Sequence, residues 1–264
     1  MADKLPIILA HGLGGFDEIK IFGITIQYFK GIKRHLEECG YTVFVTRVRP
    51  TASIKNRAED FKKAILSFTD SKVNIIAHSM GGLDARYMIS RLGMADRVGT
   101  LVTIGTPHWG SEFADWGVRV LGEKLGLIWL LEKVFGIDTA GFRDLMTESC
   151  QKFNKEITDV KGVRYISYAG QQSWHKVNCF LQVPYWYIRF KTGQNDGLVH
   201  AESAKWGDFR GVVAADHWNQ IGWWIFPCKW PERFNAKRFY EGIVRDISQQ
   251  NYQAQDFREG MWQE

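Results

Sequence analysis

Several features are scarce or missing in this sequence of 264 residues. No apolar stretch reaches the roughly 20 residues of a transmembrane helix, so we predict no transmembrane segment. The first residues, Met1 to Lys4, run straight into an apolar strand, without the apolar stretch of a signal peptide. This start favours a cytoplasmic protein and leaves open export by a signal-less or trimmed route. Repeats and low-complexity linkers are also lacking, which favours a single domain over residues 1–264.

Cysteines are few and far apart, at positions 39, 150, 179 and 228. None forms C-x-x-C, which excludes a zinc knuckle and a thioredoxin-like site. Two interpretations of the cysteines stay open: buried free thiols, or a disulfide between Cys179 and Cys228. Histidines at the metal-binding spacings H-x-x-x-H and H-E-x-x-H are absent, so we expect no histidine metal site.

Charge of one sign does not dominate, because the net charge is only +5 and both signs are interspersed. The densest basic cluster, residues 30–35, alternates with apolar Phe29, Ile32 and Leu36. This pattern is typical of the solvated face of an amphipathic helix, so we predict no nucleic-acid partner.

Apolar patterns along the chain alternate between strand and helix periodicity. Strands are expected at residues 5–10, 42–48, 73–76, 98–104 and 163–169, and helices at 22–39, 54–69, 83–92 and 231–250. Repeated strand–helix units predict an α/β fold with a mostly parallel central sheet covered by helices on both faces.

A serine lies at the sharp turn between a predicted buried strand and a helix. Residues 77–81 read Ala-His-Ser-Met-Gly directly after Val73 to Ile76. Such a strand–turn–helix elbow raises the serine Oγ above the sheet, where a base can reach it. Small residues two before and two after the serine, here Ala77 and Gly81, allow strand and helix to approach. We therefore predict Ser79 as a catalytic nucleophile.

The elbow requires partners elsewhere in the chain. An oxyanion hole needs two backbone N–H groups, which we assign to Met80 and to Leu13 in the glycine-rich loop after the first strand. An acid and then a histidine must follow the serine, and Asp196 and His217 appear in that order. Asp216 is a competing acid, which we rank lower because adjacent residues at a strand end point to opposite sides.

Four segments together resemble the bacterial true lipases, the family I triacylglycerol lipases. They are residues 11–17, 73–82, 105–111 and 194–199, and the likeness extends over about 5–112 and 163–221. The resemblance implies an α/β-hydrolase fold with a helical lid. It also implies the roles of Ser79, Asp196 and His217 as catalytic triad and of Leu13 and Met80 as oxyanion donors.

The resemblance implies a structural calcium ion as well, but its ligands are missing. Asn219 stands two residues after His217, where the family has an aspartate, and no Asp or Glu lies between Gly170 and Asn195. Because calcium requires carboxylate oxygens, we predict no metal, or a much weaker calcium site, and no cofactor. Another link near Cys179 or Cys228 would then tie this region together.

Residues 109–155 do not fit the strand–helix pattern of the sheet and are predicted to be a lid or cap insertion. Within them, Leu125 to Phe135 is apolar nearly all round and too short to span a bilayer. A mobile lid and a fixed cap are both open. A second irregular segment, residues 171–193, is predicted to be a loop-rich region containing tryptophans.

Tryptophan is absent from the first 108 residues, and all eleven tryptophans follow. An indole ring suits a boundary between water and an apolar phase. We predict Trp109 and Trp218 to line the acyl pocket or its rim because each adjoins a site motif, with packing behind the site as the alternative.

The sequence thus predicts a serine hydrolase that cleaves esters with apolar acyl groups through an acyl-enzyme, a triacylglycerol lipase or carboxylesterase. Its partner would be lipid or ester substrate at an interface, and aliphatic polyesters would be a side substrate. A thioesterase, amidase or acyltransferase with the same triad is the alternative, because one fold supports all of these reactions. A non-catalytic binding module is less favoured, because such proteins usually lose a triad residue.

Overall fold

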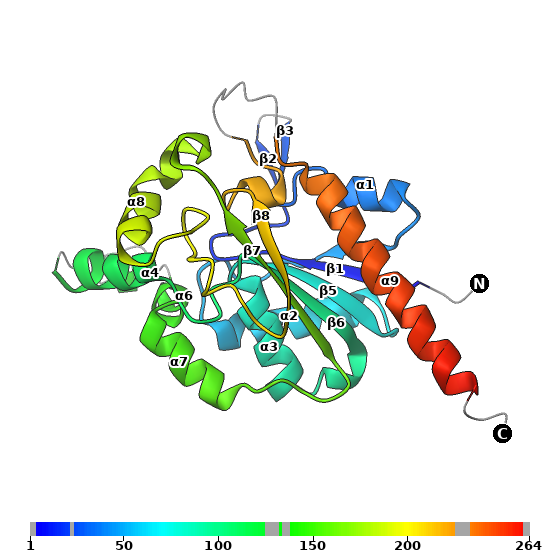
Figure 1. The fold of residues 1–264 in the computed structure, drawn as a ribbon. Helices are drawn as coiled ribbons and strands as arrows, with labels where there is room; N and C mark the ends of the chain where they lie inside the picture. Colours follow the sequence, from blue (N-terminus) through cyan, green and yellow to red (C-terminus); the bar gives the residue numbers. More distant parts are fainter. Residues whose placement is uncertain (1–3, 22–23, 125–131, 134–137, 225–232, 261–264) are drawn as a thin grey trace.

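The computed structural model describes residues 4–21, 24–124, 132–133, 138–224 and 233–260. These ranges contain a six-stranded sheet with helices around it and a separate two-stranded hairpin (Figure 1). All neighbouring strands of the large sheet pair in parallel. In spatial order they are β4 (Val43–Val45), β1 (Ile7–Ala10), β5 (Val73–His78), β6 (Val98–Ile104), β7 (Arg164–Gln171) and β8 (Asp208–Ala214).

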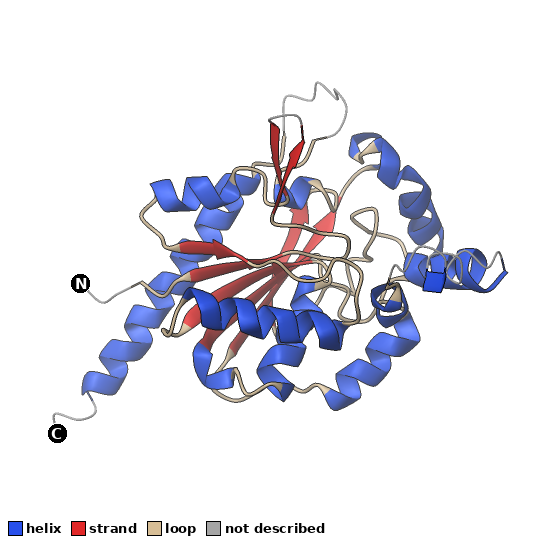
Figure 2. Cartoon of the chain, turned by 180° about the vertical axis from the view of Figure 1, so that it is seen from behind, coloured by secondary structure: helices blue, strands red, loops and turns tan. Residues whose placement is uncertain are grey.

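Helices cover both faces of this sheet. On one face, Ile8 and Ala10 of β1 join an apolar cluster with α2 (Ile54–Phe68) and α3 (Gly81–Arg91). On the other face, Ile7 and Leu9 join a cluster with α1 (Ile32–Glu38) and α9 (Ala236–Gly260). Figure 2 shows the strands between these helices. The predicted α/β fold with a parallel sheet covered on both faces is confirmed.

The predicted helix over residues 22–39 is wrong in its first half. Strands β2 (Glu18–Ile21) and β3 (Ile24–Gln27) form an antiparallel hairpin there, and α1 begins only at Ile32. Isoleucine alternates with polar residues along β3, which is the period of a strand. Gly31, with φ of 68°, adopts a left-handed conformation that interrupts any helix before Ile32.

The insertion between β6 and β7 is helical where it is described. It contains α4 (Glu112–Trp116), the π-helical η2 (Gly117–Lys124), α6 (Ala140–Asp144) and α7 (Thr147–Glu156). Residues 125–131 and 134–137, which make up most of the predicted apolar helix from Leu125 to Phe135, lie outside the described residues. Figure 1 shows these helices beyond the carboxyl ends of the strands.

Residues 171–193 are more helical than predicted. Short turns η3 (Trp174–Lys176) and η4 (Cys179–Leu181) lead into α8 (Gln182–Lys191). Pro184 is compatible with α8 because it lies in the first turn, where backbone N–H groups have no helical partner. The remaining short helices are η1 (Ala95–Arg97) and η5 (Asn219–Ile221).

Two further sequence expectations concern membranes and disulfides. In the described part of the chain, no helix combines the length and the hydropathy that crossing a bilayer requires. Cys39, Cys150 and Cys179 are free thiols, and Cys179 is exposed. Cys228, the other half of the suggested disulfide, lies outside the described residues.

Candidate active site

The loops that carry the predicted site residues meet where the strand order reverses. The chain passes from β1 outward to β4 and then returns to β5 on the other side of β1. Ligands bind at such switch points in open parallel sheets, beyond the carboxyl ends of the strands. His11 follows β1 and Ser79 follows β5 at this edge, so the topology brings the glycine-rich loop and the elbow together.

Ser79 occupies a strained turn. Its φ of 57° is the only positive value at a non-glycine residue in the described ranges, and such strain clusters at active sites. The small flanking residues fit the close approach. A Cβ on Gly81 would lie 2.8 Å from the carbonyl oxygens of Ala10 and His11, whereas the methyl group of Ala77 is accommodated in the core. The extra methyl at position 77 is therefore compatible with the elbow.

His217 and Asp196 form a buried pair. His217 Nδ1 lies 2.8 Å from Asp196 Oδ2, and the side chain of Asp196 is fully buried. The same oxygen accepts a hydrogen bond from Gln220 Nε2 at 2.7 Å. Oδ1 accepts from the backbone N–H groups of Leu198 and Val199, at 3.0 and 2.8 Å. These donors fix the carboxylate and thereby the imidazole that it contacts.

The side chain of Asp216 bonds Asn178 and the turn after His217, whereas His217 Nδ1 contacts Asp196. Asp216 Oδ2 accepts hydrogen bonds from the backbone and side-chain nitrogens of Asn178, at 2.8 and 3.0 Å. Its Oδ1 accepts from the N–H groups of Trp218 and Asn219, at 3.0 and 2.7 Å. Burial raises the pKa of Asp216 to about 6. This side chain links the turn after His217 to the segment before α8, next to Cys179.

The backbone amides of Leu13 and Met80 are available to a ligand, because neither donates a hydrogen bond within the described residues. The side chains of both residues belong to one apolar cluster, which holds the two loops together. Gly12 N–H donates to Tyr28 Oη at 3.1 Å, and Tyr28 Oη lies 2.8 Å from His78 Nδ1. Burial, and then the nearby His217, lower the pKa of His78 well below its usual value, so His78 is a neutral support.

A fully buried arginine joins the glycine-rich loop to the elbow helix. Arg57 Nη2 donates to the carbonyl oxygens of His11 and Gly12, at 2.9 and 3.2 Å. Its Nη1 donates to Arg49 O and Pro50 O, and its Nε donates to Asp84 Oδ2 at 2.9 Å. Burial raises the pKa of Asp84 to about 6, although the charge of Arg57 opposes this shift. One side chain of α2 thus connects the loop of Leu13 to helix α3, which begins directly after Met80.

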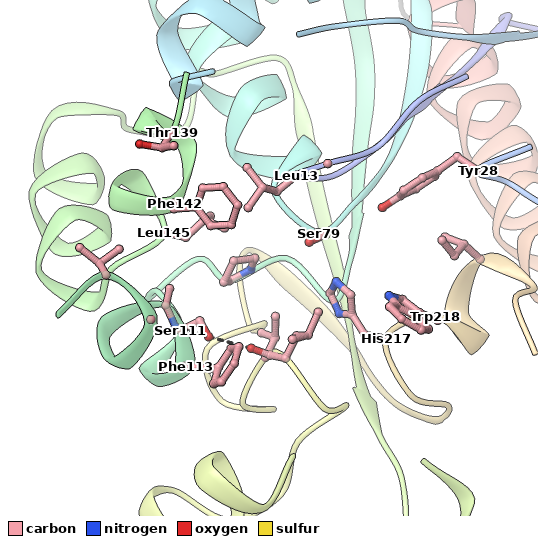
Figure 3. Close-up of a pocket in the computed structure, with 18 of the residues that line it drawn as sticks. Leu13, Tyr28, Ser79, Ser111, Phe113, Thr139, Phe142, Leu145, His217 and Trp218 are labelled. Atoms are coloured by element: carbon pink, nitrogen blue, oxygen red, sulfur yellow. Dashed lines mark hydrogen bonds between the residues drawn. The ribbon is translucent and has the colours of Figure 1, made fainter. Parts of the chain in front are cut away.

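Ser79 and His217 line the same cavity of about 570 Å³. Figure 3 shows Ser79 with Leu13 and Tyr28 on one side and His217 and Trp218 on the other. The rest of the wall is mainly apolar, and none of the described residues that line the cavity is Asp, Glu, Lys or Arg. The cavity therefore suits an uncharged, apolar group attached to a polar reacting centre.

The two tryptophans predicted at the pocket differ in position. Trp218 lines the cavity, whereas Trp109 is not part of its described lining. Trp109 is about half exposed, and its ring lies 5.8 Å from that of Trp206. The left-handed turn at Gly110, with φ of 89°, redirects the chain between Trp109 and Ser111, which does line the cavity.

At the position of the family's calcium-binding aspartate, Asn219 offers a neutral amide, whose buried Oδ1 has no hydrogen-bond partner among the described residues. The nearby Asp216 carboxylate already accepts four hydrogen bonds from N–H groups. Asn219 donates its amide to Trp223 O at 2.9 Å. Among the described residues, the cluster with metal-ligand atoms in reach is instead His35, Cys39 and Glu241, where α1 meets α9. His35 and Glu241 already bond each other there at 2.9 Å.

Four contributors to this arrangement were not predicted from the sequence: Tyr28, Arg57, Gln220 and Asn178. None belongs to a local motif, and each acts through a contact with a residue that is distant in the sequence or on another loop. For Arg57, the sequence did offer a signal, because this arginine lies on the apolar side of the predicted helix 54–69. A charged residue there must be paired when it is buried.

Comparisons with known proteins agree with the fold. The alpha/beta hydrolase fold family matches residues 6–124. Triacylglycerol lipase 2 of Saccharomyces cerevisiae is 32% identical, over 83% of this chain and 81% of its own length. A triacylglycerol lipase of Vibrio cholerae is 32% identical over 63% of this chain and 62% of its own. The structure of a metagenomic carboxyl esterase matches with a TM-score of 0.76 and 19% identity, over 95% of this chain and 77% of its own.

The fold is therefore that of the α/β hydrolases. Within that class, the chain belongs to the lipases, and the resemblance to bacterial lipases is confirmed. It is an ester hydrolase of the lipase and carboxylesterase type.

Proposed function

We propose that this enzyme hydrolyses esters of apolar acyl groups, with triacylglycerol as its substrate class, through an acyl-enzyme on Ser79. One observation carries the proposal: Ser79 and His217 share an apolar cavity while His217 is hydrogen-bonded to the buried Asp196. The curated relatives named above are triacylglycerol lipases, which supports the choice of substrate.

The proposed reaction has two steps. Ser79 Oγ attacks the ester carbonyl while His217 Nε2 accepts its proton, and Asp196 orients the imidazole and stabilises its charged form. The amides of Leu13 and Met80 donate to the oxyanion; losing one such donor typically costs about 3 kcal/mol of transition-state stabilisation. The alcohol leaves with the proton from His217, and water then releases the acid with His217 as base. None of these steps requires a metal or a cofactor, and we propose that the enzyme uses neither.

The first test is covalent labelling with a serine-directed fluorophosphonate, followed by intact mass. We expect one adduct on the wild type and none on Ser79→Ala. Ser111 lines the same cavity, so Ser111→Ala is the matched control and should still be labelled. Labelling of Ser79→Ala at the wild-type rate would contradict the assignment of the nucleophile.

The second test compares the wild type with Ser79→Ala. It measures the release of acid from soluble short-chain esters and from emulsified long-chain triacylglycerols. Activity that rises with chain length and with the appearance of an interface would support a lipase whose residues 109–155 act as a lid. Activity restricted to short soluble esters would indicate a carboxylesterase with a fixed cap. No Ser79-dependent activity on any ester would contradict the proposed function.

A further inference from the structure

An exposed apolar surface lies on α8 and the two turns before it. Of the nine large hydrophobic side chains that are exposed in the described ranges, five lie within seventeen residues, so the exposure is concentrated. We call this group the α8 surface; it consists of Trp174, Phe180, Val183, Trp186 and Phe190. Phe190 and Val183 are the most exposed, at 83% and 69%. Contiguous exposed apolar surface of this kind marks interaction sites.

Three side chains of the α8 surface form a continuous row of rings. The ring of Trp186 lies 6.2 Å from that of Trp174 and 5.5 Å from that of Phe190. Phe180 extends the surface toward the cavity, since its ring lies 6.1 Å from that of Trp218, which lines the cavity. These contacts place the surface next to the candidate active site.

Helix α8 is held in place by its opposite side. Pro184, Tyr185 and Ile188 are buried, and Tyr185 packs in a cluster with Trp218 and Leu198. The exposed residues Val183, Trp186 and Phe190 have spacings of three and four, which places them on one face of the helix. The α8 surface is therefore exposed although the opposite side of the helix is packed against the rest of the protein.

The charged residues within the segment that carries this surface are all basic. No Asp or Glu occurs in residues 171–194, whereas Arg189 and Lys191 are exposed beside Phe190. Tryptophan and basic side chains together fit the headgroup region of a lipid layer, where an indole ring meets both water and acyl chains. Basic residues favour anionic headgroups.

We propose that the α8 surface binds the enzyme to a lipid–water interface that carries anionic headgroups and holds the cavity beside it. The use of this surface for catalysis rests on the proposed function, but lipid binding itself needs no turnover. A surface that docks first would raise the local concentration of ester in front of the cavity.

The test uses the full chain with Ser79→Ala, so that lipids are not hydrolysed. Its binding to phosphatidylcholine vesicles with and without phosphatidylglycerol is measured by co-sedimentation. We expect binding that strengthens with phosphatidylglycerol. Val183→Ser with Phe190→Ser, and separately Arg189→Glu with Lys191→Glu, should each weaken it at least tenfold.

Matched controls change the same residue types elsewhere. Leu66→Ser with Val212→Ser removes two exposed apolar side chains outside the α8 surface, and Lys55→Glu with Lys63→Glu reverses two exposed charges on α2. Both controls should bind vesicles like the parent. Circular dichroism and the melting temperature check that every variant is folded.

Several outcomes would overturn the proposal. The first is that the Ser79→Ala parent does not bind vesicles. The second is that the α8 variants bind as well as this parent, and the third is that the control variants lose as much binding as the α8 variants. A concentration-dependent dimer that the α8 variants abolish, without vesicle binding, would assign the surface to a second copy of the chain. Vesicle binding by a protein that cleaves no ester would refute the proposed function alone, and ester cleavage without vesicle binding would refute this inference alone.

Discussion

At the scale of single residues, the site depends on the lack of a side chain at Gly12. Gly12 lies against Ser79, and a Cβ at Gly12 would be 2.6 Å from Ser79 Cβ and 3.0 Å from its Oγ. It would also lie 3.1 Å from Tyr28 Oη, which accepts the Gly12 N–H. Ser79 itself is held by its N–H bond to Ile104 O and by the bond from Thr106 Oγ1 to Ser79 O. The serine therefore has little freedom to move away from an added methyl group.

The variant Gly12→Ala should consequently lose activity while staying folded. We expect kcat/KM on a soluble ester to fall about a hundredfold, because a displacement of about 1 Å at the reacting atom can cost that much. Steady-state kinetics and a melting curve measure the two effects. Gly242→Ala is the control, since a Cβ there meets open space. Full activity of Gly12→Ala would show that the loop does not constrain the serine as described.

At the scale of elements, Arg57 connects three parts of the fold that are distant in sequence. It lies on α2, bonds the carbonyl oxygens of the loop after β1, and pairs with Asp84 on α3. Of the two candidate oxyanion residues, Leu13 lies on that loop and Met80 directly precedes α3. A flexible lysine cannot reproduce this set of bonds, because its three donors lack the planar fork of the guanidinium.

Arg57→Lys should therefore reduce both turnover and stability. We expect kcat to fall about tenfold or more with a small change in KM, since oxyanion donors act mainly in the transition state. The free energy of unfolding should fall by about 2 kcal/mol because buried acceptors lose their donors. Kinetics and urea denaturation measure these effects. Arg34→Lys, at an exposed pair with Glu38, is the control and should change little; equal effects at both sites would contradict the role of Arg57.

At the scale of the whole molecule, the site is assembled from loops that emerge at one edge of the sheet. The loop that carries His217 is fixed to the segment before α8 through Asp216 and Asn178. The sequence predicts a link near Cys179 or Cys228; Asn178, next to Cys179, makes two hydrogen bonds to Asp216, and Cys228 lies outside the described residues.

Removal of metal ions by a chelator is therefore expected to leave the stability and the activity of the enzyme unchanged. Incubation with excess EDTA should alter neither the melting temperature nor the rate on a soluble ester, and added calcium should have no effect. Asp216→Ala provides the contrast, since it removes the link and should lower the melting temperature by several degrees. Activity that is lost in EDTA and restored by calcium would contradict the prediction.

How far the sequence predicts this molecule depends on the range of the interactions involved. The buried strands and the elbow at Ser79 were predictable, because local patterns of apolar and small residues produce them. The hairpin of β2 and β3 was not predicted. Residues 24–27 were assigned to a helix, although isoleucine alternates there with polar residues. Helix α8 was not predicted either, because a proline and exposed aromatic residues in a short segment are also compatible with a loop.

The sequence by itself determined the class of fold, the elbow, and the chain order of Ser79, Asp196 and His217. Only the tertiary structure decided that Asp196 and not Asp216 contacts His217, and that Trp218 and not Trp109 lines the cavity. It also determined the contacts of Arg57, Gln220 and Asn178. The physical reason is that backbone preference and apolar periodicity act over a few neighbouring residues. The direction of a buried polar side chain, in contrast, is set by partners that only the folded chain brings within hydrogen-bonding distance.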